Sequence, residues 1–185
     1  VTCAGGVTVI REQGARERYQ LLGPESALVE LWRGALTSAV PAGADAWELL
    51  DIEAGIADIG PALADQFLPQ MLNLDRVGGV SFDKGCYVGQ EIVARTHYLG
   101  RLKRRLYRGH ADAPAAPRPG ESLAGGEGEP AGQIVNAQPA PGGGYRVLAV
   151  IPIDVARGGA GRLHLADGTP LALEPLPYAI EDPAR

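Results

Sequence analysis

The sequence is poor in cysteine, in aromatic residues and in long hydrophobic runs. Its two cysteines, Cys3 and Cys86, form no CxxC pair and cannot build a disulfide framework, so we expect a reducing, cytoplasmic setting. Aromatic residues make up only 5% of the chain, which argues against a single-strand nucleic-acid binder built from stacked rings. No run approaches the roughly 18 apolar residues of a membrane span, so no membrane association is expected.

What the sequence does contain indicates a folded protein of many short elements. Its 185 residues correspond to one domain or two small ones, and an apolar fraction of 45% is enough for a sizeable core. Glycine (26) and proline (15) are abundant, which favours short elements joined by turns. The net charge of −5 excludes a generally basic nucleic-acid-binding protein. The chain begins at Val1 within an expected strand, so we expect an N-terminal piece to be missing.

Residues 1–100 predict an α+β arrangement. Residues 6–11 and 18–22 have the pattern of short strands around a polar turn. Pro24 then stands where a helix can begin, and apolar residues recur at helical spacing across residues 25–39. The order strand, turn, strand, helix is typical of an α+β layer. Two further apolar stretches follow, at residues 46–56 and at residues 67–74, where irregular turns are expected.

The composition changes after residue 100, and residues 101–185 predict a small antiparallel β-barrel. Residues 111–130 are rich in Ala, Pro, Gly and Glu, which indicates loops. Short apolar strands separated by glycine or proline turns follow without any helical period, which is typical of a small barrel or sandwich. The expected strands are 131–137, 145–153, 161–165 and 170–175.

The segment 84–91, with the sequence KGCYVGQE, is the first candidate for chemistry. Glycines flank Cys86 and residues 88–97 are compatible with a helix, so we expect the cysteine just before a helix N-terminus. The free amides of that terminus and the nearby Lys84 both favour a thiolate. A free cysteine is more often a small buried hydrophobe, as we expect for Cys3, so the sequence leaves both roles of Cys86 open.

Two other groups of charged residues have competing explanations. Glu53 stands among apolar and small residues, where its two oxygens can accept paired N–H groups of a heterocycle, although a solvated glutamate is the commoner case.

Between residues 84 and 110 the chain carries seven Lys or Arg against one acid, Glu91. This basic run can hold a polyanion, such as a polyglutamate tail or RNA phosphates, or it can be a solvated strand face. No P-loop, G-x-S-x-G or zinc-ligand spacing occurs, and no resident metal is expected.

The segment 84–91 resembles the signature of the YgfZ-type folate-binding proteins, which are relatives of the glycine-cleavage T-protein, an aminomethyltransferase. The resemblance is strong over about residues 45–108. The other stretches that resemble this family, in the same order, are LDIEAGI at 50–56, QFLPQMLNL at 66–74, GGVSF at 78–82 and IVAR at 92–95.

This resemblance implies a T-protein-like folate-binding domain with ferredoxin-like elements, followed by a C-terminal β-barrel. It implies tetrahydrofolate, or a one-carbon derivative, as the cofactor, and iron–sulfur client proteins and tRNA-modifying enzymes as partners. Glu53 would then contact the pterin, and Cys86 would be the essential thiol of the family. The other residues implied in cofactor binding are Lys84, Tyr87, Gln90, Glu91 and Arg95.

Three functions follow from these observations, and whether the protein is an enzyme stays open. The first is folate-dependent assembly or repair of iron–sulfur enzymes, with Cys86 as the reactive group. The second is a folate-dependent aminomethyl or methyl transferase, in which Cys86 has no special task because the motif cysteine is not a T-protein feature. The third is an RNA- or protein-binding adaptor that uses the basic run.

Overall fold

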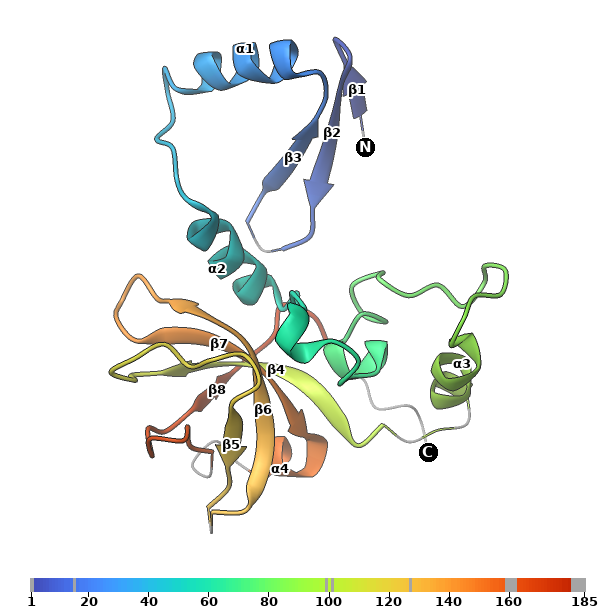
Figure 1. The fold of residues 1–185 in the computed structure, drawn as a ribbon, viewed down its shortest axis with the longest axis vertical. Coiled ribbons are helices and arrows are strands. Elements are labelled where there is room, and N and C mark those ends of the chain that lie inside the picture. Colours follow the sequence, from blue (N-terminus) through green and yellow to red (C-terminus); the bar gives the residue numbers. More distant parts are fainter. Residues whose placement is uncertain are drawn as a thin grey trace.

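The computed structural model contains two antiparallel sheets connected by helical segments, with the smaller sheet at one end of the molecule and the larger sheet at the other (Figure 1). Cys3 lies in the smaller sheet, but its side chain is outside the described part of the structure, so its expected place in the core stays a prediction. The structure describes residues 2–14, 16–98, 100, 102–126, 128–158 and 163–180.

The first sheet has three antiparallel strands, which confirm the strands expected around residues 6–11 and 18–22. A two-residue turn joins the first two strands, and its residues Gly5 and Gly6 have φ angles of 57° and 77°. Positive φ at both positions is what the tight turn of a hairpin requires, which explains the glycine pair. The strands, in spatial order, are β1 (Thr2–Ala4), β2 (Val7–Glu12) and β3 (Arg18–Leu22).

Two α-helices follow the first sheet. α1 (Glu25–Ala35) begins after Pro24, whose fixed φ suits a helix start. It confirms the expected helix, although it ends before residue 39 in a series of turns. α2 (Ala44–Ala54) ends at Gly55, which has a φ of 70° and occupies the left-handed region that favours glycine.

The chain between α2 and the second sheet is largely irregular. Its two 3₁₀ helices, η1 (Pro61–Leu63) and η2 (Pro69–Leu72), each begin at a proline, and η2 confirms the irregular turns expected at residues 67–74. α3 (Gln90–Tyr98) follows a loop and confirms the helix expected within residues 88–97. Among the described helices, none has the length and apolar character needed to cross a membrane.

The second sheet is antiparallel and has five strands. They are β4 (Arg104–Ala111), β5 (Ser122–Ala124), β6 (Pro130–Pro139), β7 (Tyr145–Pro152) and β8 (Ala172–Glu174). Their spatial order is β5-β6-β7-β4-β8, so the basic run provides β4, a strand in the interior of the sheet. The short helix α4 (Ile153–Arg157) follows β7, where the sequence predicts that the strand continues to residue 153.

The antiparallel class of this sheet is confirmed, but closure into a barrel is not found among the described residues. The edge strands β5 and β8 do not pair with each other, and His164 instead forms isolated bridges to Ala124 and Pro170. Of the strand expected at residues 161–165, the described residues 163–165 form only the isolated bridges of His164, and the chain then turns at Gly168, which has a φ of 85°. Residues 161 and 162 lie outside the described part.

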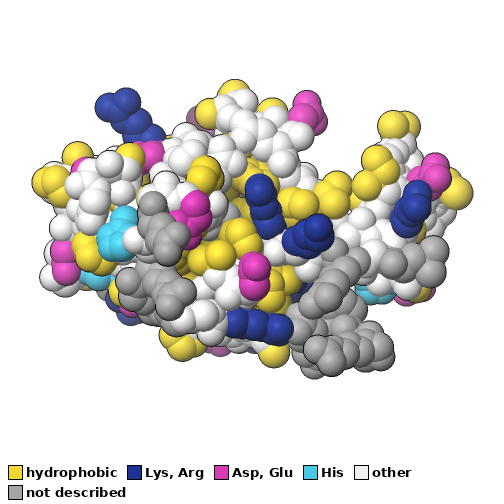
Figure 2. Space-filling model, turned by 90° about the horizontal axis from the view of Figure 1, so that it is seen from below, with side chains coloured by type: hydrophobic (Ala, Val, Ile, Leu, Met, Phe, Trp, Pro, Cys, Tyr) yellow, Lys and Arg dark blue, Asp and Glu magenta, His cyan; other side chains and the backbone are white. Residues whose placement is uncertain are grey.

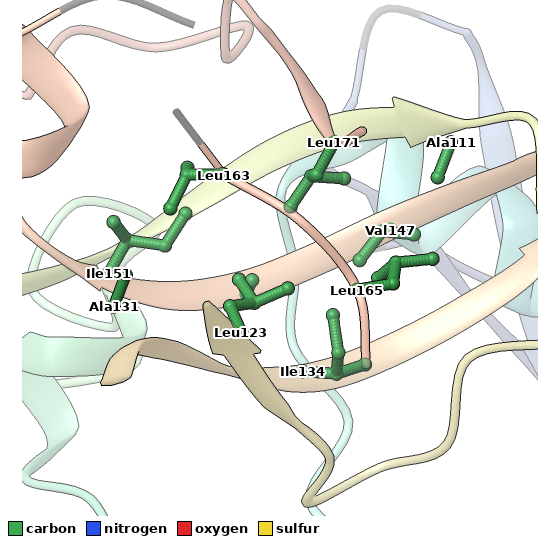
Figure 3. Packing of buried hydrophobic residues seen from close by; sticks show 10 residues of the cluster. Ala111, Leu123, Ala131, Ile134, Val147, Ile151, Leu163, Leu165 and Leu171 are labelled. Atoms are coloured by element: carbon green, nitrogen blue, oxygen red, sulfur yellow. The ribbon is translucent and has the colours of Figure 1, made fainter. Parts of the chain in front are cut away.

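The second sheet separates two hydrophobic clusters. Along β7, Val147, Ala149 and Ile151 belong to one cluster, whereas Leu148 and Val150 belong to the other. This division follows from the alternation of side chains across a strand. The first cluster lies between the strands and the chain that bridges β5 and β8 (Figure 3).

The second cluster fixes the helical segments on the sheet. Ile52 of α2, Leu63 of η1 and Leu72 of η2 are buried there. They pack against Leu106 of β4 and Val135 of β6. α2 is therefore held between the two sheets, where its other faces are available to line clefts.

Candidate functional site

A large cleft lies between the first sheet with α1 on one side and the second sheet with its loops on the other. Its volume is about 1620 Å³. Trp32 of α1 and Trp47 of α2, the two tryptophans of the chain, line it together with Tyr19 of β3. Trp32 is 56% exposed and Trp47 is 37% exposed, so parts of both indoles are accessible. An apolar cleft with aromatic walls suits a flat heterocyclic ligand.

A few polar contacts fix the wall of this cleft that β6 forms. The side-chain amide of Asn136 donates to the carbonyl oxygen of Asp58 at 2.9 Å, and its oxygen accepts from the N–H of Asp58 at 3.1 Å. Gln138 donates a hydrogen bond to the carboxylate of Glu48 on α2. These contacts connect α2 and the chain after it to β6, so this side of the cleft is held by the protein itself.

Arg18, at the start of β3, fixes the aromatic wall on α2. Its buried guanidinium donates to Oδ1 of Asp51 at 2.7 Å and to the carbonyl oxygen of Trp47 at 3.5 Å. It also lies 4.8 Å from the centroid of the Trp47 ring, within the range of a cation–π contact. A further hydrogen bond to the carbonyl oxygen of Gln13 measures 3.1 Å. Arg18 therefore joins the first sheet to α2 and orients Trp47.

A smaller cleft of about 360 Å³ adjoins the large one along α2 and contains Glu53. Leu50 lines both clefts. The side chain of Glu53 is 30% exposed, and its Oε2 lies 3.8 Å from Nε of Arg16. The carbonyl oxygen of Glu53 accepts a hydrogen bond from Nη1 of Arg108 at 2.6 Å. Glu53 therefore lies in a position from which it can contact a ligand, but among arginines.

Cys86 lies on the loop before α3, where its side chain is exposed and its thiol is free. The end of this loop is closed by local hydrogen bonds: the N–H of Gln90 donates to the carbonyl of Tyr87, and the N–H of Tyr87 donates to Oε1 of Gln90, both at 3.2 Å. The ammonium of Lys84 lies 4.8 Å from the centroid of the Tyr87 ring. Lys84, Tyr87 and Gln90 thus shape the loop that presents Cys86.

The predicted site residues are brought together only in part. Glu91 and Arg95 are exposed on α3, and neither they nor Cys86 line either of the two clefts. Glu53 lies at the smaller cleft. Neither of these two clefts is therefore lined jointly by Glu53 and the segment 84–91, and their joint site stays a prediction. In the same part of the chain, no group of three or more His, Cys, Asp or Glu residues could hold a metal ion.

A buried polar network anchors α3 and thereby the loop that carries the cysteine. Gln70 of η2 donates from Nε2 to the carbonyl oxygen of Val93 on α3 at 2.6 Å. Arg105 of β4 donates to the carbonyl oxygen of Gln70 at 2.9 Å and forms a buried ion pair with Asp75 at 2.7 Å. The network therefore connects the second sheet, η2 and α3.

The basic run does not form one positive surface. Arg105 is buried against Asp75, Arg108 is half-buried beside Glu174, and Arg104 is exposed. Figure 2 shows one face of the molecule, on which Lys and Arg side chains are dispersed among hydrophobic and acidic ones. Arg101, a further member of the run, lies outside the described residues. The arrangement supports a strand with its own ion pairs more than a polyanion-binding surface.

Tyr178 lies near the end of the described chain, between the smaller cleft and the polar network. Its hydroxyl donates to the carbonyl oxygen of Gly55 at 2.6 Å and accepts a hydrogen bond from Nδ2 of Asn73 at 3.3 Å. Burial raises the pKa of Tyr178, and the hydrogen bond from Asn73 opposes this effect. The hydroxyl thus fastens the C-terminal segment to the end of α2.

The sequence did not single out several residues that form these clefts. Trp32 fits the apolar spacing of a helix, which predicts core packing as well as it predicts a cleft wall. Trp47 carried no signal beyond its residue type. Arg18, Arg146 and Tyr178 acquire their partners only through contacts between segments far apart in the sequence.

Comparisons with curated proteins agree with the resemblance, although no family model matches the sequence. The protein named "tRNA-modifying protein YgfZ" of Yersinia pestis (strain Pestoides F) is 35% identical over an alignment of 185 positions that covers 98% of this chain and 56% of that protein. The protein of the same name from Edwardsiella ictaluri is 38% identical over an alignment of 138 positions that covers 73% of this chain and 42% of that protein. The chain thus spans about half the length of these curated relatives.

Among solved structures, the glycine cleavage system aminomethyltransferase T from Bartonella henselae has a similar fold. The TM-score is 0.67 at 18% sequence identity, over 94% of this chain and 50% of that chain. The mixed α+β architecture with antiparallel sheets is therefore a T-protein-like fold. Together with the sequence matches, this finding confirms the expected family resemblance: the chain is a homologue of the YgfZ proteins and has the fold of the glycine-cleavage T-protein.

Proposed function

We propose that this chain binds tetrahydrofolate, or a one-carbon derivative of it, and supports the assembly or repair of iron–sulfur enzymes in the cytoplasm. The observation that carries the folate part is the large cleft, which Trp32 and Trp47 line from two different helices. The proposed partners are iron–sulfur client proteins and tRNA-modifying enzymes. The curated relatives named tRNA-modifying proteins support that choice.

The residues of the large cleft fit a folate. Ligand pockets commonly measure about 300–1,000 Å³, so the observed volume has room for the pteridine and the aminobenzoyl group. Indole rings stack on flat heterocycles. Asp51 and Glu48 line the same cleft, and their carboxylates can accept N–H groups from the edge of a pteridine. A bound folate would supply a one-carbon unit.

Glu53 is the proposed contact for the N–H edge of the pterin at the smaller cleft. Its carboxylate is partly exposed and its ion pair with Arg16 is long, at 3.8 Å, so its oxygens have capacity for a ligand. The remaining proposed contacts lie around the cysteine and line neither cleft, so they would contact only a part of the ligand that extends outside both clefts. They are Lys84, Tyr87, Gln90, Glu91 and Arg95.

Cys86 is the proposed reactive group. An exposed thiol on a loop with fixed local hydrogen bonds can meet either a one-carbon unit of the folate or the iron or sulfide of a client protein. The alternative is an aminomethyl or methyl transferase, which the T-protein fold favours and which needs no thiol. An RNA- or protein-binding adaptor has less support, because Arg105 of the basic run is buried in an ion pair with Asp75 and does not add to an exposed basic surface.

Calorimetric titration of tetrahydrofolate into the chain tests the proposed binding. We expect Trp32→Ala to bind about tenfold more weakly than the unchanged chain, because the stacking surface is lost. Val29→Ala lies on the same helix but outside the lining of the cleft, and should bind normally. A complete lack of tetrahydrofolate binding by the unchanged chain would overturn the proposal. An equal loss of affinity in Trp32→Ala and Val29→Ala would show that the indole of Trp32 does not stack on the ligand.

The same titration with Glu53→Gln decides which cleft takes the heterocycle. If Glu53 accepts the N–H groups of the pterin, loss of the charged acceptor should weaken binding about tenfold. Normal binding by Glu53→Gln, combined with weak binding by Trp32→Ala, would place the heterocycle in the large cleft alone. The two variants therefore separate the two parts of the proposal.

A further inference from the structure

The smaller cleft carries more positive than negative charge. Its described lining includes four arginines and two carboxylates. Arg18 is neutralised by Asp51, which leaves three arginines facing two carboxylates. The arginines are Arg16, Arg18, Arg108 and Arg146, and the carboxylates belong to Glu53 and Glu174.

Glu174 of β8 forms ion pairs with two of these arginines. Its Oε1 forms an ion pair with Arg146 of β7, and its Oε2 lies 3.5 Å from Nε of Arg108 on β4. Arg108 is directly opposite Glu174 in the strand register, and Arg146 is the diagonal neighbour of Arg108 across β4 and β7. One carboxylate cannot neutralise two guanidinium groups, so this part of the cleft retains positive charge.

The surroundings of these arginines favour ligand binding over simple solvation. Arg108, Arg146 and Glu174 are half-buried, and Arg108 is held in place by its hydrogen bond to the carbonyl oxygen of Glu53. Charges in such partly desolvated positions interact more strongly than charges on an open surface. A planar guanidinium also matches a carboxylate geometrically, with two parallel N–H donors.

We propose that the smaller cleft is a carboxylate-binding subsite, in which Arg108 and Arg146 bind one carboxylate group of a ligand. The negative charge of Glu53 repels a second ligand carboxylate, so the smaller cleft binds one carboxylate group. Leu50 lines both clefts, so the carboxylate-binding subsite adjoins the large cleft. The carboxylate comes either from the glutamate end of a folate whose heterocycle lies in the large cleft alone, or from a free dicarboxylate. The first source rests on the proposed function and excludes Glu53 as the pterin contact, whereas the second does not rest on it.

Calorimetry with three probes tests this subsite: tetrahydrofolate, tetrahydropteroate, which lacks the glutamate, and glutarate. We expect the unchanged chain to bind tetrahydrofolate about tenfold more tightly than tetrahydropteroate, and Arg146→Gln to reduce this ratio to about one. Arg108→Gln should reduce it in the same way, so the result does not depend on the folding of a single variant. Arg33→Gln removes the same charge from the exposed surface of α1 and should keep the ratio.

The outcomes separate the subsite from the proposed function. Equal affinities for tetrahydrofolate and tetrahydropteroate, with glutarate binding that Arg146→Gln weakens, would assign the subsite to a free dicarboxylate. Glutarate binding without binding of either pterin compound would keep the subsite and overturn the folate proposal. If neither the ratio nor glutarate binding responds to Arg146→Gln and Arg108→Gln, the subsite does not exist.

Discussion

Cys86 and Tyr178 are reactive side chains in opposite surroundings. Cys86 is exposed on a loop, so its sulfur is accessible to a ligand or to another protein. The hydroxyl of Tyr178 is held between the carbonyl of Gly55 and the amide of Asn73. The first residue is therefore suited to chemistry with a partner, and the second to holding the C-terminal segment.

Cys86→Ser should leave the fold unchanged and abolish the support of iron–sulfur enzymes, because an exposed side chain contributes little to packing whereas a hydroxyl cannot replace a thiolate. A complementation assay with a cluster-dependent enzyme measures the function, and circular dichroism checks the fold. Ser81→Ala, exposed on the same loop, is the matched control and should complement. Full complementation by Cys86→Ser would refute the role of the thiol and favour the transferase alternative.

Tyr178 should ionise at a higher pH than an exposed tyrosine, because burial raises its pKa. Its neutral form is preferred in the folded state, so this contribution to stability is complete below the ordinary pKa of about 10 and is lost as the pH rises through the higher pKa of the folded state. Spectrophotometric titration of phenolate should show a late-ionising group that Tyr178→Phe lacks. The prediction is wrong if the unchanged chain shows no late-ionising tyrosine, so that its phenolate titration covers the same pH range as that of Tyr178→Phe.

At the scale of elements, one buried cation fastens β4 to η2. Arg105 pairs with Asp75 through two hydrogen bonds, at 2.7 and 3.2 Å, and also donates to the carbonyl oxygen of Gln70. Since Gln70 in turn donates to Val93 of α3, the position of that helix depends on the same contacts. The pair is thus a structural element of the region that carries the cysteine loop.

Arg105→Gln should lower the free energy of unfolding by about 3 kcal/mol, because Asp75 is left buried without its cation. Urea unfolding measures this difference. Arg104→Gln is the matched control on the same strand, and its exposed side chain predicts a change within about 0.5 kcal/mol. Similar unfolding curves for the two variants would show that the ion pair contributes nothing net.

Local periodicity predicts the elements that depend on local sequence. The strand at residues 18–22 and the start of α1 at residue 25 follow from alternation and helical spacing. Whether the second sheet closes into a barrel could not be predicted in this way, because closure depends on how the chain around Gly168 turns relative to β5 and β8. Elements are thus predictable where neighbours in sequence determine them, and not where distant strands must meet.

The same limit applies to the candidate site. The position of Cys86 before a helix could be predicted because the motif and the helix are adjacent in sequence. The cleft that Trp32 and Trp47 line could not be predicted, since it depends on how α1 and α2 lie relative to each other. Arg18 contributes to this arrangement because it joins the first sheet to α2.

At the scale of the whole molecule, the first sheet is attached to the rest through a small number of contacts. It stands apart from the second sheet, with α1 beside it and α2 leading away from it (Figure 1). Arg18 supplies a buried connection between this part and α2 through Asp51 and Trp47. The large cleft lies at this junction, so its width depends on how firmly the first sheet is held.

Arg18→Gln should loosen the first sheet without unfolding the second. Loss of the ion pair to Asp51 allows local opening, because regions with few buried contacts open independently of the core. Hydrogen exchange should accelerate in β2 and β3 and stay unchanged in β6 and β7. Arg11→Gln, which removes an exposed ion pair on β2, is the control and should alter neither sheet. Uniform acceleration over both sheets would instead indicate one cooperative unit.

The glycine at the end of α2 determines how closely the C-terminal segment approaches the helix. A Cβ at Gly55 would lie 2.7 Å from Leu176 and 2.8 Å from the hydroxyl of Tyr178, closer than real Cβ atoms come to their neighbours. Leu176 is also part of the lining that faces the arginines. A methyl group at position 55 would therefore force the side chains of Leu176 and Tyr178 to move, so the absence of a side chain at this glycine helps to set the dimensions of the charged recess.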